Sequence, residues 1–162
     1  MISVTILTLN SKKHIEAVLK SLSQFSEVIC YDTGSTDDTL EIASRFDNVV
    51  IHRGEFLGFG PTHNIASELA TSDWVLSIDS DEILTKELAA EIVSLELDPN
   101  TIYSFRRNNY FRNTFVKGCG WYPDYVLRLY NKKKTQFTSA LVHESIASHG
   151  FKIVKLSHPC LH

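Results

Sequence analysis

The sequence predicts an α/β domain with a mixed, mainly parallel sheet and helices on both faces. Up to residue 98, β-type apolar runs alternate four times with apolar stripes at helical spacing. The short connections between them indicate parallel strands joined by right-handed crossovers. After Pro99, strand patterns follow one another without strong helices, so residues 99–162 are expected to extend the same sheet in a mixed or antiparallel manner.

The first strand–helix unit is predicted at the start of the chain. Residues 2–9 are rich in Val, Ile, Leu and Thr, which is typical of a strand. Apolar residues between Ile15 and Phe25 recur at helical spacing, and Asn10 or Ser11 is available to cap that helix. These residues therefore predict a strand, a short turn and a helix.

The second unit combines a strand over residues 27–31 with a helix over residues 40–46. Between them, Ser35 and Asp38 have the spacing of a capping box. Gly34 permits a tight turn into the helix.

Two further units complete the first half of the chain. Residues 49–52 predict a strand, which a loop containing Gly54, Gly58, Gly60 and Pro61 separates from a helix near Ile65–Ala70. Residues 74–78 predict the fourth strand, and Thr85 is placed to cap the helix that follows it. The strands expected in the second half are residues 101–107, 110–116, 125–130 and 151–156.

The fourth strand ends abruptly in acids, at Asp79, Asp81 and Glu82. Polar groups also follow the first two strands, at Thr8 and Asn10 and at Asp32. Ligands of open parallel sheets bind outside the carboxyl ends of the strands, where loops and helix N-termini converge. These strand ends therefore predict one shared cleft.

Asp79 and Asp81 are two residues apart, so on extended backbone they project to one side, with Ser80 and Glu82 on the other. Two such close carboxylates repel each other unless a cation, a proton or a positive side chain lies between them. A hard divalent ion suits them, and Mg²⁺ often takes one or two carboxylates together with substrate phosphates. The alternative is a solvated turn whose acids only charge the surface.

Composition is ordinary for a globular protein, with 43% hydrophobic and 22% charged residues and a formal net charge of -3. This balance gives no indication of nucleic acid as a partner. Three widely spaced cysteines fit reduced thiols and a cytoplasmic location. No apolar run approaches the length of a membrane span, so any contact with the inner face of the membrane is expected to be peripheral.

Taken together, these residues resemble inverting family 2 glycosyltransferases, which have the GT-A fold, a Rossmann-like fold of nucleotide-diphospho-sugar transferases. More narrowly, they resemble bacterial enzymes that add a sugar to the lipopolysaccharide inner core. The matching positions are residues 4–10, 32–37, 79–82, 120–124 and 142–144, with Asn64 and Arg128.

The resemblance implies a nucleotide-diphosphate sugar as donor and a saccharide or lipid-linked saccharide as acceptor. It implies Mg²⁺ or Mn²⁺ held by Asp79 and Asp81, with His143 as a further candidate ligand. The residues that it assigns to donor binding are Thr8, Asn10, Asp32, Asn64, Asp79 and Arg128.

Inversion requires a carboxylate that accepts the proton of the acceptor hydroxyl. Asp124 falls where the resemblance places the acceptor-side acid, and Glu144 is its rival. The resemblance divides one domain, residues 1–162, into a nucleotide-sugar-binding part, residues 1–98, and an acceptor-side part, residues 99–162. Members of this group usually continue with a helical piece, so a shortened acceptor side is expected here.

Two other functions remain open from the residues. A sugar-phosphate nucleotidyltransferase would share the fold and the acids, but it begins with a Gly-rich phosphate loop, and residues 10–13 lack glycine. A truncated donor-binding module without catalysis would bind the donor and would not depend on Asp124. Arg106, Arg107 and Arg128 either clamp phosphate or pair with local acids.

Overall fold

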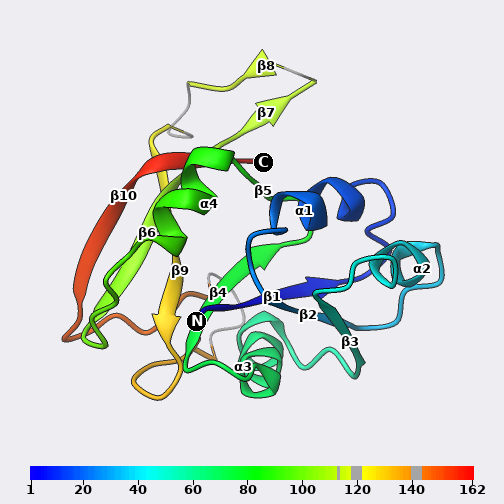
Figure 1. Ribbon diagram of the computed structural model, residues 1–162, viewed down its shortest axis with the longest axis horizontal. Helices are drawn as coiled ribbons and strands as arrows, with labels where there is room; N and C mark the ends of the chain where they lie inside the picture. Colours follow the sequence, from blue (N-terminus) through cyan, green and yellow to red (C-terminus); the bar gives the residue numbers. More distant parts are fainter. Residues whose placement is uncertain (113, 118–121, 140–143) are drawn as a thin grey trace.

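The computed structural model describes residues 1–112, 114–117, 122–139 and 144–162. One large sheet has the strand order β3-β2-β1-β4-β9-β6-β10-β5, which confirms the predicted α/β class (Figure 1). Its strands are β1 (Ser3–Thr8), β2 (Glu27–Asp32), β3 (Val49–Arg53), β4 (Trp74–Asp79), β5 (Ile83–Leu84), β6 (Thr101–Asn108), β9 (Asp124–Asn131) and β10 (Lys152–Leu161).

The first half of the chain forms the parallel part of this sheet. β1 lies between β2 and β4 and is parallel to both, while β3 is parallel to β2 on the far side. In this register Thr8 lies opposite Asp32, and Leu7 lies opposite Asp79. The carboxyl ends of β1, β2 and β4 therefore meet at one edge, as predicted.

The second half extends the sheet in a mixed manner, which confirms the expectation for residues 99–162. β9 is antiparallel to both β4 and β6, whereas β10 is parallel to β6 and antiparallel to β5. Because β9 runs in the opposite direction to β4, its amino end lies beside the carboxyl end of β4. Asp124 is thereby paired with Arg107, near the acids that follow β4.

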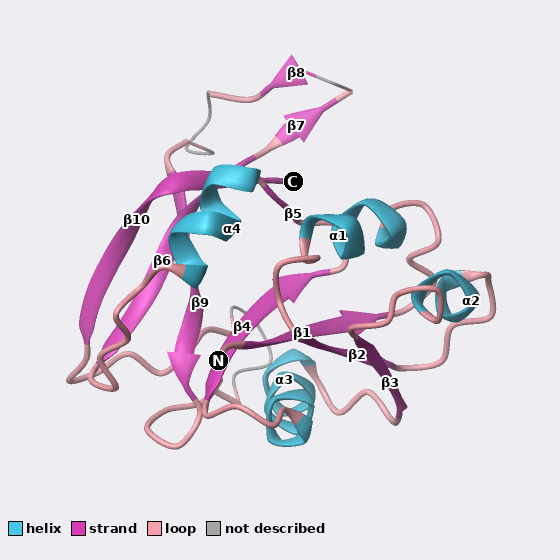
Figure 2. Ribbon diagram, in the orientation of Figure 1, coloured by secondary structure: helices cyan, strands magenta, loops and turns pink. Residues whose placement is uncertain are grey.

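Helices cover both faces of the sheet (Figure 2). α1 (Ile15–Ser21), α2 (Thr39–Ala43) and α4 (Lys86–Val93) pack in the larger core with Val4, Ile6 and Val28. α3 (Phe59–Leu69) lies against β1 and β2 on the other face, where a smaller core contains Ile29, Val75 and Tyr130. Alternating strand residues thus enter opposite cores, and each fully buried aliphatic side chain contributes about 1.5–3 kcal/mol.

The helix caps agree only in part with the sequence predictions. Thr85 caps α4, since its Oγ1 accepts the backbone N–H of Leu88 at 3.2 Å. The predicted cap of α1 is wrong, because α1 begins after His14 without a side-chain cap. Asn10 instead accepts the backbone N–H of Thr36 with its Oδ1, at 2.8 Å.

The predicted capping box before α2 is also wrong. Ser35 donates its hydroxyl to Asp32 rather than capping the helix, and Asp38 makes no side-chain cap bond. The oxygen of that hydroxyl accepts the N–H of Asn10 at 2.9 Å, so it is already engaged.

Two segments differ from their predicted structure. Gly60 and Pro61, expected in a loop, lie in the first turn of α3. A Cβ at Gly60 would lie 1.9 Å from the carbonyl oxygen of Thr138, so only glycine fits this approach. Residues 110–116, expected as one strand, form a separate hairpin of β7 (Tyr110–Phe111) and β8 (Thr114–Phe115).

None of the helices in the described ranges has the length and apolar content needed to cross a bilayer.

Candidate active site

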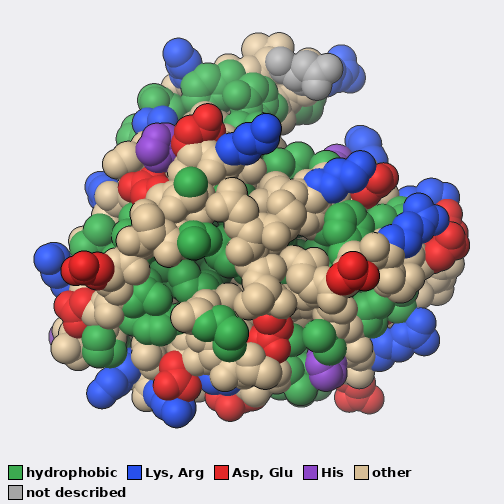
Figure 3. Space-filling view, viewed as in Figure 1, with side chains coloured by type: hydrophobic (Ala, Val, Ile, Leu, Met, Phe, Trp, Pro, Cys, Tyr) green, Lys and Arg blue, Asp and Glu red, His purple; other side chains and the backbone are tan. Residues whose placement is uncertain are grey.

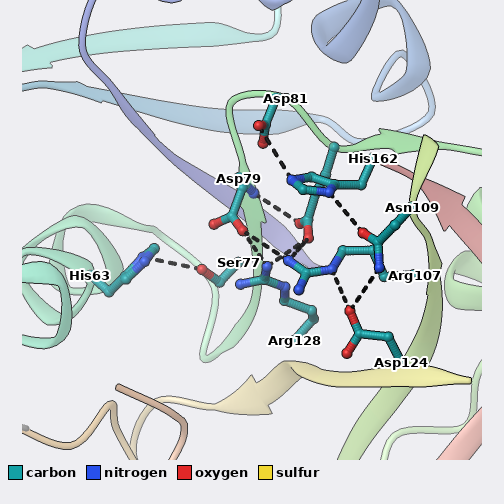
Figure 4. A network of polar contacts seen from close by, with 10 residues as sticks. His63, Ser77, Asp79, Asp81, Arg107, Asn109, Asp124, Arg128 and His162 are labelled. Carbon is teal, nitrogen blue, oxygen red and sulfur yellow. Dashed lines mark hydrogen bonds and ion pairs between the residues drawn. The ribbon is translucent and has the colours of Figure 1, made fainter. Parts of the chain in front are cut away.

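A network of acids and bases occupies the edge where the strand ends meet (Figure 4). Arg128, in the middle of β9, reaches Asp79 at the end of β4, with 2.5 Å between Nη2 and Oδ2. The same nitrogen lies 2.7 Å from Oε1 of Glu82, which is completely buried. One arginine therefore neutralises two carboxylates from the acidic stretch.

Residues 79–82 form a tight turn, which contradicts the prediction of extended backbone through Asp81. The N–H of Glu82 donates to the carbonyl oxygen of Asp79 at 3.0 Å, and the N–H of Asp79 donates to Oε2 of Glu82 at 3.0 Å. As a result, the Asp79 side chain meets Arg128, while Asp81 meets His162. Asp79 and Asp81 therefore face different partners.

A second arginine connects this acidic turn to the predicted catalytic base. Arg107, on β6, lies 3.4 Å from Glu82 through Nη1 and donates from Nε to Oδ2 of Asp124 at 2.8 Å. Asn109 donates to the same oxygen of Asp124 at 3.2 Å. Asp124 is thus oriented by two donors, both on its Oδ2.

His162 completes a chain of hydrogen bonds between Asp124 and Asp81. Its Nδ1 lies 2.8 Å from Oδ1 of Asn109, and its Nε2 lies 3.3 Å from Oδ2 of Asp81. Sequence reasoning missed Asn109 and His162 as site residues. They are separated by 53 positions in the sequence, and only the pairing of β10 with β6 brings them together.

The charges of the network shift the pKa values of its members. Burial opposes the charged form of Asp79, but the adjacent Arg128 outweighs it and lowers the pKa of this carboxyl. The hydrogen bond between His162 and Asp81 lowers the pKa of Asp81 and raises that of His162. Asp79 and Asp81 are therefore held in their ionised form.

Two cavities border the acidic turn. One cavity of about 410 Å³ has Asp79, Arg107, Arg128 and Glu144 among its lining residues. The other is a cleft of about 350 Å³, lined by Leu7, Thr8, Leu9, Thr33, Phe56, Phe59 and Ser80. Asp79 borders the charged cavity and Ser80 the largely apolar cleft, so the turn borders two chemically distinct spaces.

The residues predicted to bind the nucleotide lie beside the apolar cleft. Asp32 is buried and accepts hydrogen bonds from Thr8 Oγ1 at 3.1 Å and from the N–H groups of Gly34 and Ser35 at 3.1 and 2.9 Å. Its carboxylate therefore shapes the loop after β2, and Asn10 holds the next part of that loop. Direct contact of Asp32 with a base stays a prediction.

Asn64, another residue predicted to bind the donor, lies on α3. Asn64 pairs with the backbone of Phe137 in both directions, accepting its N–H at 2.9 Å and donating to its oxygen at 3.0 Å. Asn64 thus holds the segment that leads to Glu144, and its contact with a donor stays a prediction. His143 lies outside the described residues.

The acidic turn fits a divalent ion only together with a ligand. The side chains of Asp79 and Asp81 are 36% and 49% exposed, so their oxygens are accessible. Within the described ranges, no group of three or more His, Cys, Asp or Glu residues is arranged to hold a metal. Two carboxylates suit Mg²⁺ or Mn²⁺ when water and a diphosphate supply the other ligands.

Solved structures with similar folds are glycosyltransferases of the GT-A type. A mannosyltransferase from Pyrobaculum calidifontis, solved with GDP-Man and Mn²⁺, matches with a TM-score of 0.71 at 17% identity, over 99% of this chain and 56% of that one. TarS from S. aureus, in complex with UDP-GlcNAc, matches with a TM-score of 0.68 at 20% identity, over 99% and 58% of the two chains. These matches confirm the predicted GT-A fold.

Sequence comparison identifies the family. The family model described as glycosyl transferase family 2 matches residues 3–156, so the chain belongs to that family. An uncharacterised glycosyltransferase of Rickettsia conorii is 33% identical over 153 residues, which are 90% of this chain and 54% of that protein. The lipopolysaccharide core biosynthesis glycosyltransferase LpsC of Rhizobium meliloti is 26% identical over 92% of this chain and 58% of that protein. This chain therefore spans little more than half the length of these relatives.

Proposed function

We propose that this chain transfers a sugar, with inversion, from a nucleotide-diphosphate donor to a saccharide or lipid-linked saccharide acceptor. The observation that carries the proposal is that the acidic turn borders both cavities, one through Asp79 and the other through Ser80. A nucleoside suits the largely apolar cleft beside Thr8, and a sugar suits the polar cavity beside Arg107 and Arg128. The diphosphate between them would then lie over Asp79 and Asp81.

The side chains of the network have distinct roles in this proposal. A divalent ion held by Asp79 and Asp81 would supply Lewis-acid stabilisation of the negative charge on the leaving diphosphate. Arg128 keeps Asp79 ionised and oriented toward the cavity. The loops that border the donor are held by Thr8, Asn10, Asp32 and Asn64. We therefore assign these residues to donor binding because they position those loops.

The transfer itself is one displacement at the anomeric carbon. The acceptor oxygen forms the new glycosidic bond as the bond to the diphosphate breaks, and the hydroxyl proton passes to a carboxylate. We assign that proton to Oδ1 of Asp124, because Arg107 and Asn109 both engage Oδ2. Glu144 borders the polar cavity beside Arg107 and Arg128 and is the alternative base.

The relatives favour a role in the cell envelope. The name of the Rhizobium meliloti protein refers to lipopolysaccharide core biosynthesis, and two structural neighbours were solved with nucleotide sugars. We accordingly propose an acceptor in lipopolysaccharide or another envelope glycan, with transfer on the cytoplasmic side of the membrane.

The test is donor binding by the chain with and without Mn²⁺. A panel of nucleotide sugars is added, and the thermal midpoint of unfolding is followed. We expect at least one donor to raise the midpoint with Mn²⁺ and much less without it, because ligands that bind only the native state stabilise it. Asp81→Asn should lower the apparent affinity for the donor in Mn²⁺, obtained from the donor-dependent thermal shift, roughly tenfold or more.

Asp47→Asn is the matched control, because Asp47 is an exposed acid outside the network. It removes the same charge and should leave the donor-dependent shift unchanged. If no nucleotide sugar stabilises the chain in the presence of Mn²⁺, the proposed function is wrong.

A further inference from the structure

The hairpin of β7 and β8 projects from the body of the molecule (Figure 1). Among the described residues, its two strands pair with each other and with no strand of the large sheet. Phe111 is 65% exposed and Tyr110 is 45% exposed. Figure 3 shows hydrophobic side chains gathered on this hairpin. Large apolar side chains grouped on a projecting element mark a surface that contacts a partner.

The charges of this region are all positive. Residues 108–123 include Arg112 and Lys117 and contain neither Asp nor Glu. Arg112 lies over the ring of Phe111, with 5.5 Å from Cζ to the ring centroid, and Lys117 lies over the ring of Phe115 at 5.4 Å from Nζ. Each cation is therefore held beside an aromatic ring and has no acid of the hairpin to neutralise it.

We propose that this hairpin docks on the surface of a bilayer that contains anionic lipids. Aromatic rings are most stable at the level of the lipid headgroups, where one part of the ring is apolar and another is hydrated. Lysine and arginine beside them are attracted to anionic headgroups while their aliphatic stems cover apolar surface. The hairpin combines both features on an element that the body of the protein leaves uncovered.

The hairpin is connected to the predicted catalytic base through Asn109, the residue before β7. The N–H of Val116 donates to the carbonyl oxygen of Asn109 at 2.9 Å, which closes the hairpin. The side chain of Asn109 donates to Asp124 at 3.2 Å. A docked hairpin would thus hold the Asp124 side of the site toward the membrane, where a lipid-linked acceptor lies. This orientation rests on the proposed function, whereas docking itself does not.

The experiment is sedimentation of the chain with lipid vesicles in the absence of donor. We expect binding to phosphatidylcholine vesicles that contain phosphatidylglycerol, weaker binding to pure phosphatidylcholine, and loss of binding as salt is raised. Arg112→Gln with Lys117→Gln should lower the partition coefficient roughly 30-fold. Phe111→Ser should weaken binding to the same vesicles without changing its salt dependence.

The matched control is Lys133→Gln with Lys134→Gln, which removes two charges at the opposite end of β9. These lysines follow Asn131, where β9 ends, whereas the hairpin lies near its start at Asp124. The control should bind vesicles as the unmodified chain does. Donor-induced stabilisation should persist in all variants, so failure of docking can be told apart from failure of the proposed function.

Three results would overturn the proposal. The first is no binding to anionic vesicles at low salt, and the second is binding that needs Lys133 and Lys134 but not the hairpin. The third is equally tight binding of water-soluble glycerophosphoglycerol, which would show that the hairpin recognises a free anion rather than a membrane. If Phe111→Ser lowers the thermal midpoint of unfolding, Phe111→Tyr is measured in its place. Phe111→Tyr keeps the aromatic ring and should retain binding to the vesicles.

Discussion

Glu82 is completely buried and still has two cationic partners, because Arg128 reaches it from β9 and Arg107 from β6. A buried carboxylate without such partners would be strongly destabilising. Its second oxygen accepts the N–H of Asp79 and so fixes the turn. The position of Asp79 therefore depends on an acid that lies beneath it and does not line either cavity.

His63 shows how burial determines the charge of a single side chain. Its ring stacks on Phe137 with 4.4 Å between centroids, and its Nδ1 lies 3.2 Å from the hydroxyl of Ser77. Burial disfavours the imidazolium and lowers the pKa of His63 to about 4. The residue is therefore neutral in the folded protein at neutral pH.

This pKa predicts acid sensitivity. The unfolded chain takes up the proton near the ordinary pKa of 6.5, whereas the folded chain takes it up only near 4. Stability from this residue is therefore complete above pH 6.5 and is lost as the pH falls toward 4. Urea unfolding at about pH 7.5 and about pH 5 should show a loss of about 2 kcal/mol from His63.

His63→Gln removes this titration and should reduce the difference between the two pH values by that amount. His149→Gln is the control, because His149 is exposed. If both variants keep the full pH dependence of the unmodified chain, another group is responsible for it.

At the scale of elements, β9 is the strand that places Asp124 and Arg128 near the carboxyl ends of the parallel strands. It is antiparallel between β4 and β6, so its first residue, Asp124, lies beside the strand ends that carry the acids. Asp124 and Arg128 are four residues apart on this strand, and both enter the charged network, Asp124 through Arg107 and Arg128 through Asp79 and Glu82. One strand thus supplies both the predicted base and the cation that holds Asp79.

Asp124→Asn should separate binding from chemistry. We expect the donor-induced thermal shift to persist and the rate of sugar transfer to fall about 100-fold or more, since the amide cannot accept the proton. The measurement is release of nucleoside diphosphate with a saccharide acceptor, in parallel with the thermal shift.

Glu144→Gln is the matched comparison, because Glu144 borders the cavity that Arg107, the partner of Asp124, also lines. A steep loss of turnover in Glu144→Gln, with Asp124→Asn unaffected, would transfer the role of base to Glu144. Unchanged behaviour in both variants would favour a donor-binding module without catalysis.

Sequence reasoning predicted the strands well because period-two apolar patterns and helical stripes are local. It failed where several groups compete for one partner, as at Ser35, whose hydroxyl bonds Asp32 instead of capping α2. It failed again for the acidic turn. The hydrogen bond from the N–H of Asp79 to Glu82 requires the Glu82 carboxylate to be buried, and Arg128 makes that burial possible by pairing with it. The pair of Asn109 and His162 was beyond its reach, since no local pattern predicts the register of β10 on β6.

At the scale of the whole molecule, the network joins the two parts that the resemblance distinguished. Asp79, Asp81 and Glu82 come from residues 1–98, whereas their partners Arg128 and His162 come from residues 99–162. Neither part holds a complete charged site on its own. Donor and acceptor sides are therefore expected to be coupled in stability as well as in chemistry.

Arg128→Met tests this coupling. It leaves Asp79 and buried Glu82 with one fewer cation, and removing one partner of a buried ion pair costs about 3–5 kcal/mol. Urea unfolding at neutral pH should show a loss near the lower end of this range, because Arg107 remains 3.4 Å from Glu82.

The double variant Arg128→Met with Glu82→Gln removes the unpaired charge as well. It should recover part of the loss, and the double-mutant cycle gives the coupling energy between the two residues. A loss below about 1 kcal/mol in the single variant would contradict a charged, buried Glu82.

The burial of Glu82 also has a consequence for the order of events during synthesis. The chain leaves the ribosome from its N-terminus, so β1 to β4 emerge before the two arginines that Glu82 requires. Until Arg107 and Arg128 are available, this carboxylate is more stable in water than in the sheet. The acidic turn can therefore reach its final shape only after β6 and β9 have joined the growing sheet.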